Sequence, residues 1–325
     1  MNIFDKLVAS QGLGKLREIT DEQSSYFHLI HDELERSSII LYRGTDKKSL
    51  LSKFEGFEEF SLTDEAEKLF YFGEKAKYAS EVGLKFSNSL GTVELEELVE
   101  LTGFTSTVFE RSKNGYESFD LGNQDFSDFF SDKDKAIGHI RDSFESLTHE
   151  QKLAVRNMLI SFLHTHGENM YKNESMLLST SENYPIASEH AGRNGVVCVY
   201  WIPEHLKKFS INSNSDVQYG RLLEGTLIPC IDTPLHIEEY ETSVLGALLP
   251  KYLLGYYDKS RKHFVVNHHL FKFGLHRSLQ NLVVNGCDLD QSDFDTRVSA
   301  ETTFARSIEV SADKIQSELV QRLNS

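Results

Sequence analysis

The feature that most constrains the fold is the run Ile39 to Thr45, where apolar residues give way to Arg43 and Gly44. An unbroken apolar stretch of this length, rich in β-branched and aromatic residues, predicts a buried strand. The arginine guanidinium stays charged at every physiological pH, so a fixed cation lies at the end of that strand. We therefore expect a sheet with one positively charged position at its edge.

Two later segments repeat this pattern of an apolar strand next to polar side chains. The run 177–181 reads Leu-Leu-Ser-Thr-Ser, which puts Ser179, Thr180 and Ser181 directly after two leucines. The run 239–241 reads Glu-Tyr-Glu and leads into a second apolar stretch. The sequence thus predicts three polar groups, each at the edge of a strand.

Arginine, Ser-Thr-Ser and Glu-x-Glu in this order resemble the R-S-E clade of mono-ADP-ribosyltransferases, which includes bacterial toxins, phage enzymes and vertebrate ecto-enzymes. The likeness continues after Ser181, where 182–191 and 195–203 are similar to the family's loop, short helix and returning strand. The resemblance implies an α+β, ADP-ribosyltransferase-like fold. In it, two mostly antiparallel sheets pack around an NAD cleft, with N-terminal helices and a helical insertion.

The resemblance implies a role for each residue of the first two motifs. Arg43 would hold a phosphate of NAD through two parallel hydrogen bonds, and the backbone of Gly44 would bond the nicotinamide amide. Ser179 would bond the nicotinamide-side ribose or orient the glutamate, while Thr180 and Ser181 would fix the strand edge and the loop that follows. Tyr184 would stack on nicotinamide. NAD is therefore the expected substrate.

Each of these residues also has a simpler structural interpretation. Arg43 is then an exposed strand-end arginine in an ion pair, and Ser-Thr-Ser is a polar turn that satisfies its own backbone. Tyr184 is then a core tyrosine whose hydroxyl is bonded. These alternatives stay open at the level of the sequence.

The Glu-x-Glu motif is expected to carry the chemistry. Glu241 would accept a hydrogen bond from the ribose 2'-hydroxyl and stabilise the oxocarbenium-like charge at the anomeric carbon. In a strand, Glu239 points to the same face as Glu241 and would act on the acceptor as base or orienter. Glu238 leaves the register of the pair open, and Pro250 lies farther from it than in many relatives. The alternative is a solvated acidic strand edge.

The function implied is transfer of ADP-ribose from NAD to a macromolecule, in a toxin-like or phage-defence effector. Glu-x-Glu resembles the arginine-modifying subgroup, which favours a protein side chain such as arginine as the acceptor. Related enzymes that modify nucleic acid bases have similar cores, so RNA is the other expected acceptor. An NAD glycohydrolase needs the same residues with water as acceptor. A binding module that has kept the fold without catalysis is the non-enzyme alternative.

Composition excludes other classes of protein. The chain has 325 residues and a formal net charge of -16, which argues against binding the phosphate backbone of nucleic acid over a broad surface. No apolar run approaches the roughly 18 residues that span a bilayer, and residues 1–15 lack the apolar core of a signal peptide. Cys198, Cys230 and Cys287 predict no disulfide framework. We expect a cytoplasmic protein without a membrane partner.

The histidines do not match a zinc signature. His164 and His166, and His263 with His268 and His269, would bind a metal only if carboxylates or further histidines converged on them. We therefore expect no metal.

Two capping boxes predict where helices begin, at 20–23 and at 148–151. The second opens a helix with an apolar stripe that we expect to end at Gly167. Between 195 and 255, β-branched and aromatic runs broken by Gly, Asn and Pro predict strands and hairpins.

These elements suggest a division into domains. We expect an ADP-ribosyltransferase domain over 1–275, with a mainly helical insertion at about 62–168, and a helical extension over 276–325. Within the insertion, the polar and aromatic stretch 103–135 is predicted to be rich in loops and would be a docking surface for an antitoxin or inhibitor protein.

Overall fold

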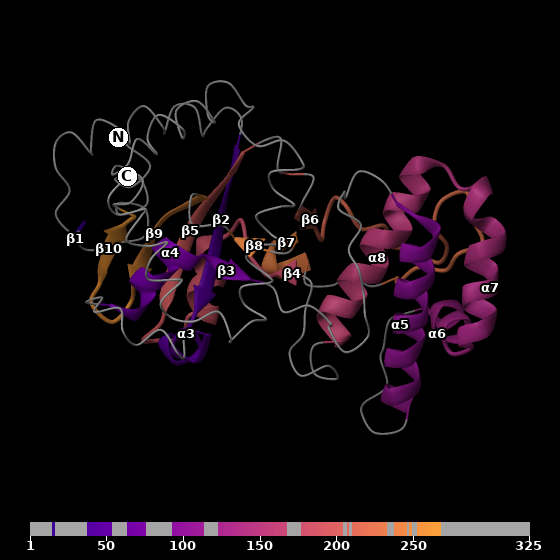
Figure 1. The fold of residues 1–325 in the computed structure, drawn as a ribbon, viewed down its shortest axis with the longest axis horizontal. Helices are drawn as coiled ribbons and strands as arrows, with labels where there is room; N and C mark the ends of the chain where they lie inside the picture. Colours follow the sequence, from indigo (N-terminus) through magenta and orange to yellow (C-terminus); the bar gives the residue numbers. More distant parts are fainter. Residues whose placement is uncertain are drawn as a thin grey trace, which may run out of the picture. The chain divides into compact units, whose positions relative to one another are not determined.

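The computed structural model describes residues 15–16, 38–53, 64–75, 93–113, 123–167, 177–203, 207, 210–232, 237–245, 247–248 and 252–267 (Figure 1). The described residues of Met1–Lys75, Ser179–Lys207 and Ala247–Ser325 form one compact unit, the first unit. Those of Ala76–Leu178 and Lys208–Gly246 form the second unit.

A five-stranded sheet is the centre of the first unit, with strand order β1-β10-β9-β5-β2 (Figure 1). The β1–β10 pair is parallel, and the other neighbours are antiparallel. The strands are β1 (Lys15–Leu16), β2 (Ser38–Thr45), β5 (Val196–Pro203), β9 (Leu253–Asp258) and β10 (His263–Val266). Every residue of β9, the middle strand of the sheet, is buried, including the charged Asp258 at its end. The predicted strand at 39–45 is confirmed.

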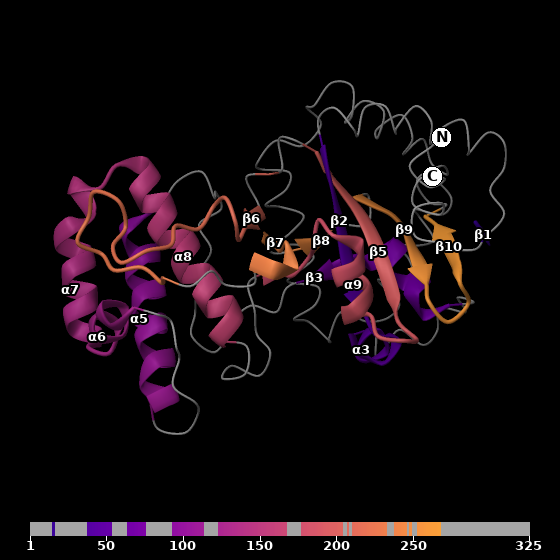
Figure 2. The same ribbon diagram turned by 180° about the vertical axis from the view of Figure 1, so that it is seen from behind.

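The two faces of β2 contact different elements because successive side chains point to opposite sides of a strand. Tyr42 and Gly44 face α9 (Tyr184–His190), which lies against β2 and β5 (Figure 2). A Cβ at position 44 would lie 1.7 Å from the carbonyl oxygen of Ala187, so glycine is required for this close approach. Arg43 points to the opposite face.

Short elements complete the first unit. Helix α4 contacts β9, and the ring of Phe70 packs on that of Tyr256 with centroids 5.5 Å apart. The strands β3 and β8 form a separate antiparallel pair. These elements are α3 (Lys47–Lys53), the 3-10 helix η1 (Glu65–Lys68), α4 (Leu69–Phe72), β3 (Glu74–Lys75) and β8 (Ala247–Leu248).

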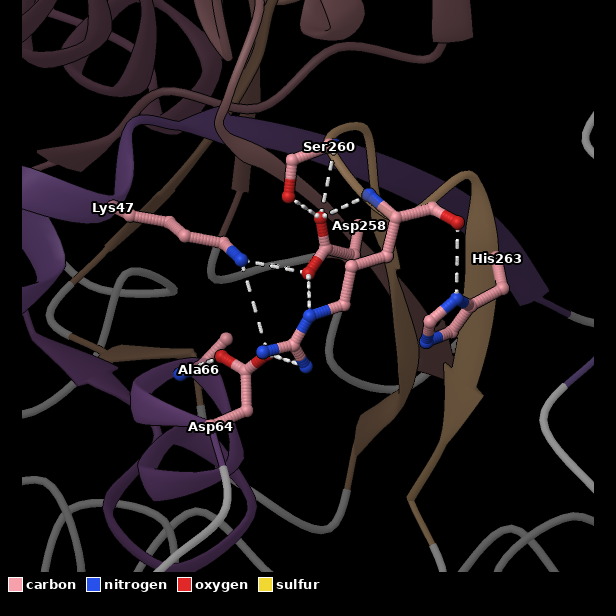
Figure 3. A network of polar contacts seen from close by, with 7 residues as sticks. Lys47, Asp64, Ala66, Asp258, Ser260 and His263 are labelled. Atoms are coloured by element: carbon pink, nitrogen blue, oxygen red, sulfur yellow. Dashed lines mark hydrogen bonds and ion pairs between the residues drawn. The ribbon is translucent and has the colours of Figure 1, made fainter.

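A network of ion pairs joins these short elements to the β9–β10 turn (Figure 3). Lys47 Nζ lies 2.6 Å from Asp258 Oδ2, and Arg261 Nη1 lies 2.7 Å from Asp64 Oδ2. The side chain of Asp258 is fully buried, and its Oδ1 accepts from the backbone and hydroxyl of Ser260. The network therefore ties three segments that are far apart in sequence.

The second unit combines a helical group with a three-stranded antiparallel sheet of order β4-β7-β6. Its helices are α5 (Leu95–Lys113), α6 (Gln124–Phe130), α7 (Lys133–Ser143), the 3-10 helix η3 (Phe144–Ser146), α8 (His149–Gly167) and the 3-10 helix η5 (Ile237–Glu239). Its strands are β4 (Leu177–Leu178), β6 (Ser210–Asn212) and β7 (Thr242–Leu245).

Phenylalanines form the core of the helical group. Phe126 and Phe130, one turn apart on α6, are fully buried, with ring centroids 4.5 Å apart. Phe109 from α5 stacks on Phe162 from α8 at 5.4 Å. The spacing of the α6 pair is that of one helix face, so these rings form a core and are not available as a docking surface.

The mixture of helices and antiparallel sheets is α+β, as predicted. The capping box at 148–151 is confirmed, since Thr148 N donates to Gln151 Oε1 at 2.8 Å and α8 ends at Gly167. The loop-rich prediction for 103–135 is wrong for its described residues, which are mostly in α5, α6 and α7.

The capping box at 20–23, the extension 276–325 and Cys287, Pro250, His268 and His269 lie outside the described residues, and the predicted domain boundaries stay a prediction. Cys198 and Cys230 are both buried.

Candidate functional site

Arg43 is held by a bidentate ion pair. Its Nε and Nη2 donate to the two carboxylate oxygens of Glu74 at 2.7 and 2.6 Å. The side chain of Glu74 is 1% exposed and that of Arg43 is 17% exposed. Glu74 is the first residue of β3 and directly follows Gly73, which ends α4 with a positive φ of 64°. The guanidinium plane is therefore fixed.

The electrostatics of this pair favour the charged arginine. Burial by itself lowers the pKa of Arg43, but the charge and hydrogen bonds of Glu74 outweigh burial and raise the pKa above its ordinary value. The simpler interpretation of Arg43 as an exposed arginine in an ion pair is partly met. The ion pair is present, but the side chain is mostly covered.

The Ser-Thr-Ser segment lies along the outer edge of β2. Tyr42 and Ser181 exchange two backbone hydrogen bonds, each 2.8 Å long. Arg43 Nη1 donates to the carbonyl oxygen of Ser179 at 2.5 Å. The structure therefore brings the arginine motif and the serine motif together within the first unit, although they are 136 residues apart.

The three residues of this motif have different surroundings. Ser179 is exposed, whereas Thr180 and Ser181 are each 4% exposed. The hydroxyl oxygen of Ser181 accepts from the backbone N–H of Asn183 at 2.9 Å. The Ser181 hydroxyl thus satisfies a backbone N–H at the start of the loop that follows the motif.

Tyr184 and Gly44 belong to the packing between β2 and α9. Tyr184 is 7% exposed, and its ring meets that of Tyr42 edge to face at 5.6 Å. Burial raises the pKa of its phenol. The geometry of Tyr184 is that of a core tyrosine, and the missing side chain of Gly44 makes room for α9.

Glu241 is a buried carboxylate of the second unit. It is 7% exposed and directly precedes β7. Its Oε1 accepts from the hydroxyl of Ser243 at 2.5 Å and lies 3.2 Å from Nε2 of His164. The carbonyl oxygen of Glu241 accepts from both the N–H and the hydroxyl of Ser213. Both the side chain and the backbone of Glu241 are therefore anchored.

The prediction that Glu239 and Glu241 share one face of a strand is wrong. Glu239 ends the 3-10 helix η5, and β7 begins only at Thr242. Between the two glutamates, Tyr240 has a φ of 48°, a left-handed conformation that breaks the alternation of a strand. Glu238 is exposed on the same turn of η5, whereas Glu241 is buried. Glu241 is thus a buried and anchored carboxylate of the motif.

The sequence-predicted residues fall into two groups. Arg43, Gly44, Ser179, Thr180 and Tyr184 belong to the first unit, and Glu239 and Glu241 belong to the second.

Sequence reasoning missed the polar partners in both groups. Glu74 is 31 residues from Arg43, and no local spacing signals the pair. For His164 the sequence did offer a signal, because the His164 and His166 pair stood out as candidate metal ligands. That signal did not point to the contact with Glu241. Ser243, on the β7 strand two residues from Glu241, lies where alternation places both side chains on one face.

Over the described ranges, no group of three or more His, Cys, Asp or Glu side chains is arranged to hold a metal ion. His263 contacts the carbonyl oxygen of Arg261 through Nδ1 at 3.2 Å. Among the helices of those same ranges, none combines the length and the apolarity that crossing a membrane would require.

Comparisons with known proteins identify no relative: no protein-family model, no curated protein and no solved structure matches this chain.

Proposed function

We propose that this chain is a mono-ADP-ribosyltransferase with an ADP-ribosyltransferase-like fold, which moves ADP-ribose from NAD to a macromolecular acceptor. The observation that carries the proposal is the contact of Arg43 with Ser179, reinforced by the backbone pairing of Tyr42 with Ser181. Two motifs that resemble the R-S-E clade in sequence are also neighbours in space. A chance resemblance of short motifs gives no reason for such a contact.

Arg43 is suited to bind an NAD phosphate even though Glu74 holds it. A guanidinium has five N–H groups, and within the described residues Arg43 donates three of them to Glu74 and Ser179. The other two N–H groups, one on each terminal nitrogen, would donate to an NAD phosphate. Glu74 would orient the guanidinium and stabilise its charge.

Glu241 would supply the negative charge that the reaction needs. In the proposed step, the bond from the ribose anomeric carbon to the nicotinamide nitrogen breaks, and neutral nicotinamide leaves. The carboxylate stabilises the positive charge that develops on the ribose. The acceptor nucleophile then bonds the anomeric carbon and loses a proton, for which Glu239 is the candidate base.

Two alternatives use the same residues. In an NAD glycohydrolase, water takes the position of the acceptor. In a non-catalytic module, Arg43 is structural, and its bidentate pair with Glu74 favours this second reading. The acceptor of the transferase is a protein side chain, with arginine as a candidate, or RNA. A toxin-like or phage-defence role would bring an antitoxin or inhibitor partner.

The test is nicotinamide release from NAD by the wild type and by Glu241→Gln, with cell lysate or purified RNA as acceptor. We expect Glu241→Gln to release nicotinamide about 100- to 1000-fold more slowly, because its amide lacks the stabilising charge. Mass spectrometry of the labelled species distinguishes protein, RNA and free ADP-ribose. Equal rates for a folded Glu241→Gln and the wild type would refute the proposal.

A further inference from the structure

A histidine and a serine hold the side chain of Glu241 by the same oxygen. His164 Nε2 lies 3.2 Å from Glu241 Oε1, and Ser243 Oγ lies 2.5 Å from it. The side chains of His164 and Glu241 are 11% and 9% exposed. Two contacts on one oxygen fix the rotation of the carboxylate about its terminal bond, and a buried contact is screened little by water.

The elements behind these contacts are themselves anchored. His164 is on α8, whose start is fixed by the capping box and whose inner face carries the buried residues Phe162 and Leu163. Glu241 is fixed on its backbone side by Ser213, which bonds its carbonyl oxygen twice. A side chain held between two anchored elements has few alternative rotamers.

We propose that His164 is a positioning residue that orients the Glu241 carboxylate for nicotinamide release; this inference rests on the proposed function. His164 acts through Glu241 and does not touch the substrate. Its ring nitrogen donates a hydrogen bond to Oε1, which fixes the angle at which the carboxylate meets the ribose. A catalytic group misplaced by about 1 Å loses up to about 100-fold in rate.

A positioning role and a structural role predict different kinetics. If the contact only stabilises the second unit, its loss lowers stability and leaves the turnover number of the folded protein unchanged. If it positions Glu241, its loss lowers kcat and leaves the KM for NAD nearly unchanged, because the missing interaction is one needed in the transition state.

The experiment compares His164→Leu with His164→Gln in the full chain. Leucine removes the N–H donor, and glutamine restores an N–H at the same reach. His166→Leu is the matched control, since it removes an imidazole two residues farther along the same helix. Each variant is assayed for nicotinamide release and for thermal unfolding. If the leucine variant fails to fold, His164→Met provides a flexible side chain without a donor.

We expect His164→Leu to lower kcat about 10- to 100-fold with KM for NAD within about twofold of wild type. Glutamine should recover most of that loss, and His166→Leu should match the wild type. In a Glu241→Gln background, His164→Leu should cause no further loss, because both changes act on one group.

Three results would overturn the proposal. A folded His164→Leu with the kcat of His166→Leu would show that Glu241 needs no help from His164, while the transferase function stands. A loss that glutamine does not recover would indicate a packing role. Absence of nicotinamide release by the wild type with every acceptor would remove the proposed function and the positioning role together.

Discussion

The two compact units hold their candidate charges in different ways. In the first unit, the cation Arg43 is matched by a full opposite charge, the buried carboxylate of Glu74. In the second unit, the anion Glu241 is held by a hydroxyl and an imidazole.

This difference matches the two tasks in the proposed reaction. A group that binds a phosphate benefits from a fixed plane and keeps its charge regardless of neighbours. A group that must stabilise charge developing on a sugar loses that ability if a fixed cation neutralises it. The comparison therefore teaches that both units orient their candidate charge, the first through a buried counter-charge and the second through a hydroxyl and an imidazole.

The two units can be followed separately in one unfolding experiment. Trp201 is the only tryptophan of the chain and is fully buried in β5, so its fluorescence reports on the first unit. Among the described residues, the long helices α5 and α8 belong to the second unit, so the helical circular dichroism of these residues comes mainly from that unit.

The largest effect on stability is expected for Glu74→Gln. The change leaves Arg43 mostly covered and without its counter-charge, which costs about 3–5 kcal/mol. In urea unfolding, the midpoint of Trp201 fluorescence should fall clearly more than the midpoint of helical dichroism.

Glu189→Gln is the matched control for that measurement, since Glu189 is exposed on α9 of the same unit. Its free energy of unfolding should equal that of the wild type within about 0.5 kcal/mol. An equally small change for Glu74→Gln would mean that the first unit does not depend on charge compensation.

The next effect concerns the network around Asp258. Burial raises the pKa of Asp258, but hydrogen bonds from Lys47 and Ser260 outweigh burial and lower it below the ordinary value. Because the folded-state pKa is the lower one, the contribution of Asp258 is complete above the ordinary carboxyl pKa of about 4 and is lost as the pH falls through the folded value.

Asp258→Asn should therefore lower the free energy of unfolding by about 3 kcal/mol at neutral pH, and the two proteins should converge in acid. Urea unfolding followed by Trp201 fluorescence across a pH series measures this. Glu189→Gln, at an exposed position on α9 of the same unit, should run parallel to the wild type. A constant gap between Asp258→Asn and the wild type at all pH values would contradict the account.

The smallest effect is expected at Tyr240 of the second unit. A bulky residue with positive φ is strained, and asparagine adopts this conformation more readily. Tyr240 is 53% exposed, so little packing is lost. Tyr240→Asn should raise the free energy of unfolding by about 1 kcal/mol, seen in helical dichroism. A lower value would show that the ring contributes more than the strain costs.

Local patterns predicted the elements that depend on neighbouring residues. The box at 148–151 and the stripe that follows gave α8, because capping and helical periodicity act over a few residues. The apolar run of β2 and the strand β5 were also predicted from local sequence, whereas the short helix α9 was expected from the family resemblance.

Contacts between distant residues were not predictable in this way. The pair of Arg43 with Glu74 and the contact of His164 with Glu241, 77 residues apart, arise from tertiary structure. The stretch 103–135 was misread because its phenylalanines were taken with the surrounding aspartates, although Phe126 and Phe130 have helical spacing. The strand predicted through Glu239 failed because nothing in the sequence marks Tyr240 as left-handed.

The most direct test of the central claim measures NAD binding and nicotinamide release side by side for wild type, Arg43→Lys and Glu241→Gln. The account predicts that Glu241→Gln binds NAD normally and releases nicotinamide at least about 100-fold more slowly. Arg43→Lys should bind NAD about tenfold more weakly, since it loses the planar fork. A folded wild type that neither binds NAD nor releases nicotinamide with any acceptor would contradict the claim.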